Sequence, residues 1–218
     1  LPLHTDQGRC QVLADISFWD YSRQPGCYLT VRSFWQGKVT LNGQDWQVGI
    51  IPAVWFGKNG SQSISFENGQ LLLRPWEKHN QAFNNFNGSL ATVSFNQKLF
   101  FDSQAYQLAW LSAATNGEVK PALQFTEQTV ALGELQITGK YIQRLVLPGG
   151  PYVVVLDQPA ATVKVPVGSY SQPDVRLEQG GTEAFLDSSR STDRRISVDA
   201  KTPAVLAIGG PLTNSVLV

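Results

Sequence analysis

Six acidic residues in the first half of the chain carry the functional groups that a hydrolytic site would need. They are Asp15, Asp20, Asp45, Glu67, Glu77 and Asp102. A glycoside hydrolase uses two carboxyl groups that flank the scissile bond, and these groups can lie far apart in the sequence. Acidic side chains in turns and at strand ends are mostly solvated instead. Hydrolysis is therefore the third of three hypotheses about function.

The scarcity of histidine argues against most other catalytic and metal-binding sites. The chain contains only His4 and His79. A zinc site built on two or three histidines would need both of them. A serine triad would also need one as its base, and no Gly-x-Ser-x-Gly elbow is present. The sequence thus predicts a protein that is not an enzyme and that holds no metal and no cofactor.

The two cysteines, Cys10 and Cys27, are the candidates for a single disulfide. A bridge between them would close a short loop and contribute a few kcal/mol, about 3 on the chain-entropy estimate. Disulfides persist in oxidising compartments, so this pairing would fit an exported protein. Two unpaired, buried thiols are the alternative.

Tryptophans are the candidates for ligand binding. Trp35, Trp46 and Trp110 fall within alternating segments, where core packing is expected. Trp19 and Trp55 fall near turns, and Trp76 opens a long polar stretch over residues 75–87. Exposed aromatic rings mark binding surfaces, and they stack on the faces of sugars. Trp19, Trp55 and Trp76 are therefore the predicted ligand-binding residues, with packing in the core as the alternative at each position.

Composition limits the partners. Lysine and arginine together number 17, as do aspartate and glutamate, so no net field would attract nucleic acid. The longest apolar stretches, such as Tyr152–Leu156, are far shorter than the roughly 20 residues of a membrane-spanning helix. The chain begins at Leu1 and has no methionine; we expect either that a leader peptide was removed or that the chain was shortened artificially. Export to the periplasm, cell surface or exterior is the expected localisation.

Alternation of apolar and polar residues with period two recurs almost everywhere along the chain, and no segment of helical length shows a clear apolar stripe. Asn-Gly pairs between such segments are typical of tight hairpin turns. We expect three hairpins, with arms at Lys38–Leu41 and Asp45–Ile50, Ser63–Phe66 and Leu71–Leu73, and Ser89–Phe95 and Lys98–Phe101. Their turns would be Asn42–Gly43, Asn68–Gly69 and Asn96–Gln97. A further strand, Tyr106–Trp110, would lead to a turn at Asn116–Gly117.

The composition changes after residue 117. All six tryptophans lie between Trp19 and Trp110, whereas valine, proline and glycine become frequent later. This change predicts a hairpin-rich antiparallel domain over residues 1–117 and a small β-sandwich over residues 118–218. Its strands are expected at 122–126, 134–138, 141–147, 152–156, 161–165, 174–178, 194–199 and 204–208. Residues 183–195 are expected to form an exposed loop.

The segment Thr162-Val163-Lys164-Val165-Pro166-Val167-Gly168-Ser169-Tyr170, preceded by the apolar run 152–156, resembles the prealbumin-like or carboxypeptidase-regulatory-like sandwich modules of secreted bacterial proteins. In those modules a strand ends in a Pro-x-Gly-x-Tyr turn. The hairpin at 40–48 is similar to a strand pattern of large exported bacterial proteins. The resemblance implies a sandwich fold and an exported location, and it carries over no active site.

Three functions remain open. The first is a structural, adhesion or ligand-binding role at the cell envelope, with an unknown protein or a glycan as partner. The second is a carbohydrate-binding module that uses exposed tryptophans. The third is the glycoside hydrolase with paired carboxylates. A coplanar, exposed pair of tryptophans would favour the second, and two carboxyl groups facing across a cleft would favour the third.

Overall fold

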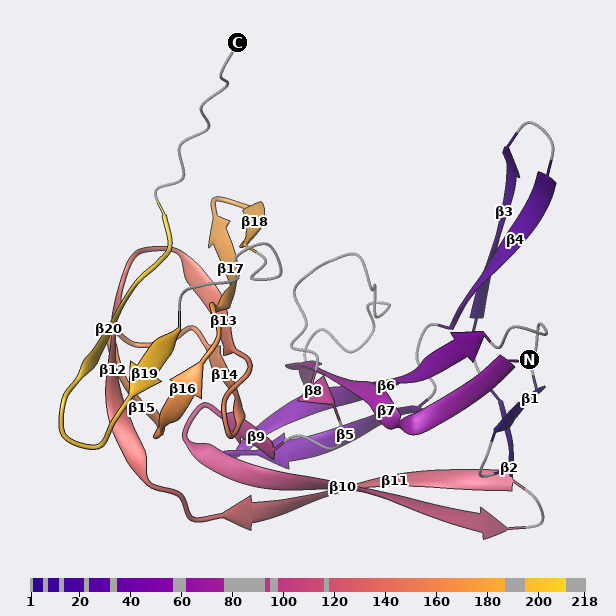
Figure 1. Cartoon of the computed structure of the whole chain (residues 1–218), viewed down its shortest axis with the longest axis horizontal. Coiled ribbons are helices and arrows are strands. Elements are labelled where there is room, and N and C mark those ends of the chain that lie inside the picture. Colours follow the sequence, from indigo (N-terminus) through magenta and orange to yellow (C-terminus); the bar gives the residue numbers. More distant parts are fainter. Residues whose placement is uncertain are drawn as a thin grey trace. The chain divides into compact units, whose positions relative to one another are not determined.

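A computed structural model describes residues 2–5, 8–11, 14–21, 24–31, 35–56, 62–76, 93–94, 98–115, 118–186 and 195–210. Side chains are described at 37–49, 71–76, 98–109, 123–186 and 195–210. This part of the chain consists of β-strands and turns and has no α-helix (Figure 1). The all-β prediction is therefore confirmed.

The chain forms two compact units, which we describe separately. Unit 1 contains residues 1–96 and 108–125, and unit 2 contains residues 97–107 and 126–218. The domain boundary expected at residue 117 stays a prediction. Each unit thus contains one long continuous part of the chain and one short segment, 108–125 in unit 1 and 97–107 in unit 2.

Unit 1 is built from antiparallel hairpins. Its strands are β1 (Pro2–Thr5), β2 (Gly8–Gln11), β3 (Ala14–Tyr21), β4 (Gln24–Val31), β5 (Trp35–Leu41), β6 (Gln44–Phe56), β7 (Gln62–Pro75), β8 (Val93–Ser94), the second part of β10 (Gln104–Thr115) and most of β11 (Glu118–Gln128). Strands β1 and β2 pair, as do β3 and β4, while β5, β6, β7 and β8 form a four-stranded sheet in that order.

The first predicted hairpin is confirmed. Strands β5 and β6 pair in register from Leu41 opposite Gln44 to Trp35 opposite Ile50. Asn42 and Gly43 form the turn with φ angles of 51° and 75°. Both angles are left-handed, which is why Asn-Gly suits this two-residue connection.

The second predicted hairpin is wrong, because Asn68 and Gly69 lie inside the continuous strand β7. Both halves of β7 pair with β6, where Ile51 lies opposite Gln70 and Ala53 opposite Ser65. The four residues 66–69 therefore face Pro52 alone. Proline has no N–H to donate to a ladder, so the extra residues form a bulge here instead of a turn.

The third predicted hairpin is also wrong. Its second arm, β9 (Lys98–Phe101), lies between β10 and β14 (Val153–Asp157), whereas β8 pairs with β7. Both edges of β9 are thus occupied by other strands.

Unit 2 is a small β-sandwich. Its strands, besides β9, the first part of β10 and β14, are β12 (Leu132–Thr138), β13 (Ile142–Leu147), β15 (Thr162–Pro166), β16 (Gly168–Tyr170), β17 (Asp174–Gln179), β18 (Thr182–Leu186), β19 (Ile196–Val198) and β20 (Ala204–Ala207). One sheet has the order β10, β9, β14, β13, β17, β18, and the other has the order β15, β12, β20. Strands β16 and β19 form a separate pair.

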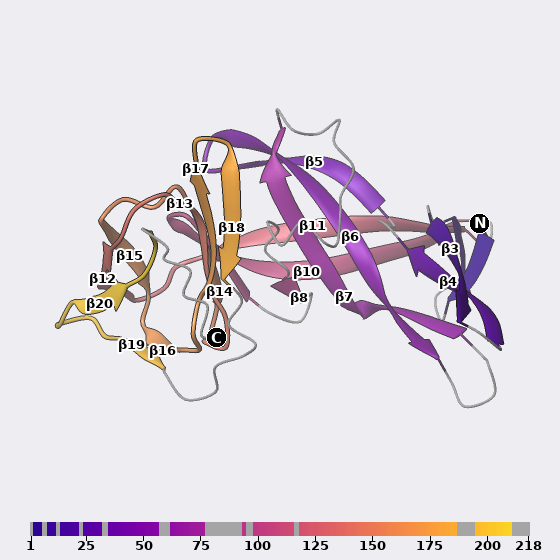
Figure 2. The same cartoon turned by 90° about the horizontal axis from the view of Figure 1, so that it is seen from above.

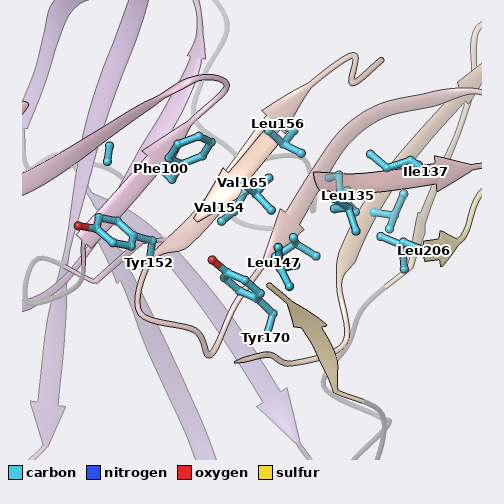
Figure 3. Close-up of a cluster of buried hydrophobic side chains, with 14 of the residues drawn as sticks. Phe100, Leu135, Ile137, Leu147, Tyr152, Val154, Leu156, Val165, Tyr170 and Leu206 are labelled. Carbon is cyan, nitrogen blue, oxygen red and sulfur yellow. The ribbon is translucent and has the colours of Figure 1, made fainter. Parts of the chain in front are cut away.

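Alternating residues of the two sheets fill a single core. Phe100, Leu145, Val154 and Leu156 come from the larger sheet, and Leu135 and other residues come from the smaller one. Figure 3 shows Phe100, Val154, Leu156 and Leu135 gathered between the strands. Burial alternates with period two in β12 and β17, whereas consecutive residues of β13 (Arg144–Leu147) and β14 (Val153–Leu156) are buried, so the middle of the larger sheet is covered on both faces.

Tyr170 closes this core at the motif Pro-x-Gly-x-Tyr. Its ring is fully buried, and its hydroxyl donates to the carbonyl oxygen of Pro166 at 2.6 Å (Figure 3). A Cβ at Gly150 would lie 2.3 Å from the Tyr170 ring, and a Cβ at Gly168 would lie 2.5 Å from Pro151. Both glycines are thus required because two chain segments approach closely here.

Two strands of unit 2 were not predicted from the sequence. Strand β16 follows β15 after one residue, and β18 begins the stretch that was expected to be a loop over 183–195. Figure 2 shows β18 running alongside β17 as a hairpin. Its turn, Gly180–Gly181, has φ angles of 57° and 78°. The remaining positions of the expected loop, 187–194, lie outside the described residues.

Candidate functional site

Around Trp46 and Gln47, the sheet formed by β5, β6 and β7 has polar residues on one face and apolar residues on the other; further along, Leu72 lies on the same face as Gln47 and Arg74 and is buried. Residues directly opposite each other in neighbouring strands share a face. On the apolar face, Val39 lies opposite Trp46, which is buried, as the sequence predicted. On the other face, Lys38 lies opposite Gln47, and Gln47 lies opposite Arg74. The polar face is therefore a continuous row across three strands.

Trp76 lies at the end of this polar row. It follows the last residue of β7 and is half-buried. The Nζ atom of Lys38 lies 4.9 Å from the centroid of its ring. Such a cation–π contact contributes about 0.5–1 kcal/mol at an exposed position. Trp76 is thus held beside strand β5 and keeps part of its ring in contact with solvent.

Asp45 completes the group of polar side chains around Trp76. Its Oδ2 lies 2.5 Å from Nζ of Lys38, and its Oδ1 accepts a hydrogen bond from Oγ1 of Thr40 at 2.8 Å. The hydrogen bonds from Lys38 and then from Thr40 lower the pKa of Asp45 below its usual value. The carboxylate is therefore ionised at neutral pH and presents a fixed acceptor. We call Lys38, Thr40, Asp45 and Trp76 the Trp76 surface.

Beside the Trp76 surface, on the same face of the sheet, Gln47 and Arg74 form a buried polar pair. Nε of Arg74 donates to Oε1 of Gln47 at 2.6 Å, and both side chains are buried. Burial lowers the pKa of Arg74. Since a buried guanidinium is costly unless it is hydrogen-bonded, the contact fixes the relative position of β6 and β7.

The other two predicted ligand-binding tryptophans lie in strands. Trp19 is in β3 opposite Gly26, and Trp55 is in β6 opposite Ser63. Their side chains lie outside the described part, so their binding role stays a prediction. The structure brings Trp76 together with Lys38 and Asp45, which the sequence did not single out as its partners. The register in which β5 pairs with β6, and β6 with β7, places these residues on one face of the sheet.

The predicted disulfide also stays a prediction. Cys10 is in β2 opposite Leu3, and Cys27 is in β4 opposite Phe18. The two cysteines thus belong to different sheets, and their side chains lie outside the described part.

Of the predicted carboxylates, Asp102 lies beside a second carboxylate in unit 2. It occupies the turn after β9, and its Oδ1 accepts a hydrogen bond from the backbone N–H of Asp157 at 2.9 Å. Both oxygens of Asp157 are bound by Arg144, through Nε and, at 2.8 Å, through Nη2. Burial raises the pKa of Asp102 above its usual value. Asp157 and Arg144 lie in the second half of the chain, where no carboxylate pair was sought.

For some of the other candidates for catalysis the structure describes only the backbone, and for two it describes nothing. Asp15 and Asp20 are in β3, Glu67 is in β7 and His4 is in β1, all with side chains outside the described part. Glu77 and His79 lie outside the described residues altogether. Among the described side chains, no group of three or more histidines, cysteines, aspartates or glutamates is arranged to hold a metal ion.

Within the described ranges, no helix has the length and apolar character needed to cross a membrane. Comparisons with models of known protein families, with curated proteins and with solved structures gave no match.

Proposed function

We propose that this is a non-enzymatic, exported protein with a ligand-binding role at the cell envelope, and that the Trp76 surface is a place where it binds carbohydrate. The observation that carries the proposal is the position of Trp76 beside Lys38. A half-buried indole ring lies next to an ammonium group, and that group is itself paired with Asp45.

This combination suits a sugar. An indole ring offers a large apolar surface that is held with little conformational freedom. Sugar hydroxyls need both donors and acceptors around that surface, and Lys38 supplies donors while Asp45 supplies acceptors. Because the buried contact between Arg74 and Gln47 joins β6 to β7 next to this surface, little ordering of the two strands is needed when a ligand binds.

The carboxylates of unit 2 support binding less well, and they support hydrolysis poorly. In a glycosidase, both carboxyl groups must face the scissile bond. Here an oxygen of Asp102 accepts the amide hydrogen of Asp157, and both oxygens of Asp157 are bound by Arg144. These contacts favour a role in holding the turn after β9 against the end of β14.

Export rests on the sequence. The resemblance of residues 162–170 to modules of secreted bacterial proteins and the two cysteines both support it. Mass spectrometry after alkylation of the native protein, without reduction, tests one part: alkylation of both Cys10 and Cys27 would count against an oxidising compartment.

A glycan array probed with the full chain, followed by calorimetric titration of the best ligand, tests the proposed function. Trp76→Ala is expected to weaken binding about tenfold or more, the equivalent of the stacking energy of one aromatic ring. Trp76→Phe should retain most of the affinity. Phe185→Ala is the matched control, since this aromatic ring is exposed on unit 2. Equal affinities for Trp76→Ala and Phe185→Ala would refute the proposal.

A further inference from the structure

Strand β18 is an open edge of the larger sheet of unit 2. It pairs with β17 on one side, and no other described strand pairs with its far side. Two neighbouring residues of this strand are exposed large hydrophobics: Phe185 is 46% exposed and Leu186 is 37% exposed. Because neighbouring residues of a strand point to opposite faces of the sheet, β18 presents apolar side chains on both faces. An edge strand of this kind is a place where a further strand can add.

The edge strands of the smaller sheet are protected against such addition. Strand β15 carries the exposed Lys164 and ends at Pro166, and β20 begins directly after Pro203. Lysine and proline are among the usual means by which proteins block an edge. Strand β18 contains neither, and its one charged residue, Glu183, is paired at 2.5 Å with Arg176 of the same hairpin. It is therefore the least protected of these three edges.

The register of the hairpin shows which backbone groups of β18 point outward. In a hairpin with a two-residue turn, the residues that flank the turn form a hydrogen-bonded pair, and non-hydrogen-bonded and hydrogen-bonded pairs then alternate. Counted from the two-glycine turn, Glu178 opposite Glu183 and Arg176 opposite Phe185 are non-hydrogen-bonded pairs. In agreement with this, the N–H of Glu178 donates away from β18, to the carbonyl oxygen of Tyr141 at 2.9 Å. The backbone N–H and C=O groups of Glu183 and Phe185 thus point to the open edge.

These outward groups match those of a second copy of the same strand. When two β18 strands run antiparallel with Ala184 opposite Ala184, Glu183 of each copy lies opposite Phe185 of the other, and each such pair exchanges both of its backbone hydrogen bonds. A shift of this register by two residues in either direction places Glu183 opposite Glu183 or opposite residue 187, which is an aspartate. Like charges directly opposite each other destabilise a sheet. Pairing with Ala184 on the two-fold axis avoids both clashes of charge.

We propose that β18 is the interface of a two-fold symmetric dimer of this chain, formed in that register. On the core side of the sheet, Ala184 and Leu186 lie opposite Leu177 and Val175, which belong to the buried core. A second strand would therefore cover the exposed edge of this core. Because both copies use the same edge, pairing occupies it in each of them and stops at two chains. The interface does not involve the Trp76 surface and is independent of carbohydrate binding.

Sedimentation velocity of the full chain, over a range of about 5 to 500 μM, tests this inference. A short ladder buries less than a standard interface of about 1,200–2,000 Å², so we expect a dimer with a dissociation constant on the order of 10–100 μM. Amide hydrogen exchange at both ends of this range locates the interface. The N–H groups of Glu183 and Phe185 should become protected at high concentration, whereas that of Ala184, which points to β17, should change little.

Charge variants test the register. Phe185→Glu places a carboxylate opposite Glu183 of the other copy, on both sides of the axis, and should weaken the dimer about tenfold or more. Adding Glu183→Lys to this variant turns each of these repulsive pairs into an ion pair and should restore the dimer. Val205→Glu is the matched control, because Val205 is an exposed hydrophobic residue of β20, and it should leave association unchanged.

A chain that stays monomeric over the whole concentration range overturns the proposal and leaves the edge open to an extended segment of another protein. A dimer that persists in Phe185→Glu, or that Glu183→Lys does not restore, also overturns it. If a variant does not fold, hydrogen exchange of the unmodified chain decides, and unprotected amides at Glu183 and Phe185 overturn the proposal. A short glycan occupies one Trp76 surface at a time, so loss of the dimer leaves its affinity unchanged and Phe185→Ala stays a valid control in the carbohydrate titration.

Discussion

The hydroxyl of Tyr170 donates a hydrogen bond to the carbonyl oxygen of Pro166, four residues earlier in the chain. The bond joins strand β16 to the end of β15 inside the sandwich of unit 2. Because its donor and acceptor lie in the same short motif, the motif folds back on itself and the Tyr170 ring fills the core.

Tyr170→Phe is expected to destabilise the protein by about 1–2 kcal/mol, because it leaves the buried carbonyl of Pro166 without its hydroxyl partner. Urea unfolding measures the change. Tyr152→Phe is the matched control: its ring is also buried, and no hydrogen bond of its hydroxyl is found within the described residues. A loss for Tyr170→Phe no larger than that for Tyr152→Phe would show that the hydrogen bond contributes little.

Alkaline pH is expected to weaken unit 2 through the same residue. Burial, and then the neighbouring Tyr152, raise the pKa of Tyr170 above its ordinary value of 10.0. The folded protein thus favours the neutral phenol, so the stability from this group is complete below pH 10 and falls as the pH rises further. Thermal unfolding between about pH 8 and pH 11 should show a decline that is smaller in Tyr170→Phe. Parallel curves for the two proteins would contradict this.

Gly150→Ala is expected to cost about 1–3 kcal/mol by overpacking. The new methyl group would meet the Tyr170 ring, which its hydroxyl contact with Pro166 holds in place. Gly180→Ala separates this clash from backbone strain, since Gly180 has a φ of 57° and no atom within 4 Å of an added Cβ. Unfolding midpoints of the two variants give the comparison, and a larger loss at Gly180 would argue against a tightly packed Tyr170.

Asp102→Asn is expected to stabilise the protein at neutral pH. The folded pKa of Asp102 lies above 3.8, mainly because of burial, so ionisation of this group opposes folding as the pH rises through that folded value. Asparagine keeps an acceptor for the amide of Asp157 and tolerates the left-handed φ of 52°. The stability difference from the parent protein should therefore be larger at about pH 7 than at about pH 4.

Asp102→Ala is the counterpart that loses both advantages. It removes the acceptor for the amide of Asp157 and places alanine in left-handed backbone, with an expected cost of about 1–3 kcal/mol. Denaturant unfolding of both variants at the two pH values completes the test. Equal stabilities for Asp102→Asn and Asp102→Ala would mean that the hydrogen bond to Asp157 is not important.

The sequence predicted local structure where turn chemistry and strand pattern agree. Asn42 and Gly43 were correctly assigned to a turn because both can adopt left-handed angles at low cost. The same dipeptide at Asn68 and Gly69 misled the prediction. There the deciding factor was Pro52, a residue of the neighbouring strand that cannot donate to the ladder. Assigning Asn-Gly to a turn considers one segment of sequence alone, and so it takes no account of the residues of the partner strand.

The candidate sites were predictable to different extents. Trp76 stood out by residue type, whereas its contact with Lys38 depends on how β7 pairs with β6 and β6 with β5. The positive φ angles of Tyr141 and Gln158 gave no signal, because neither residue type favours positive φ. The approach of Gly210, from a distant segment, to the ring of Tyr141 is likewise a contact that no local pattern predicts.

The placement of β9 has a consequence for how the chain acquires its structure during synthesis. This strand is synthesised well before β14, its parallel neighbour, and can pair with β14 only after β14 has been synthesised. Pairings between distant parts of a chain form slowly, because loop closure precedes any gain from contact. A fragment that begins at residue 118 would lack β9 altogether and would leave the edge of Val153–Val155 open to pairing with other molecules. We therefore expect such a fragment to aggregate where the full chain does not.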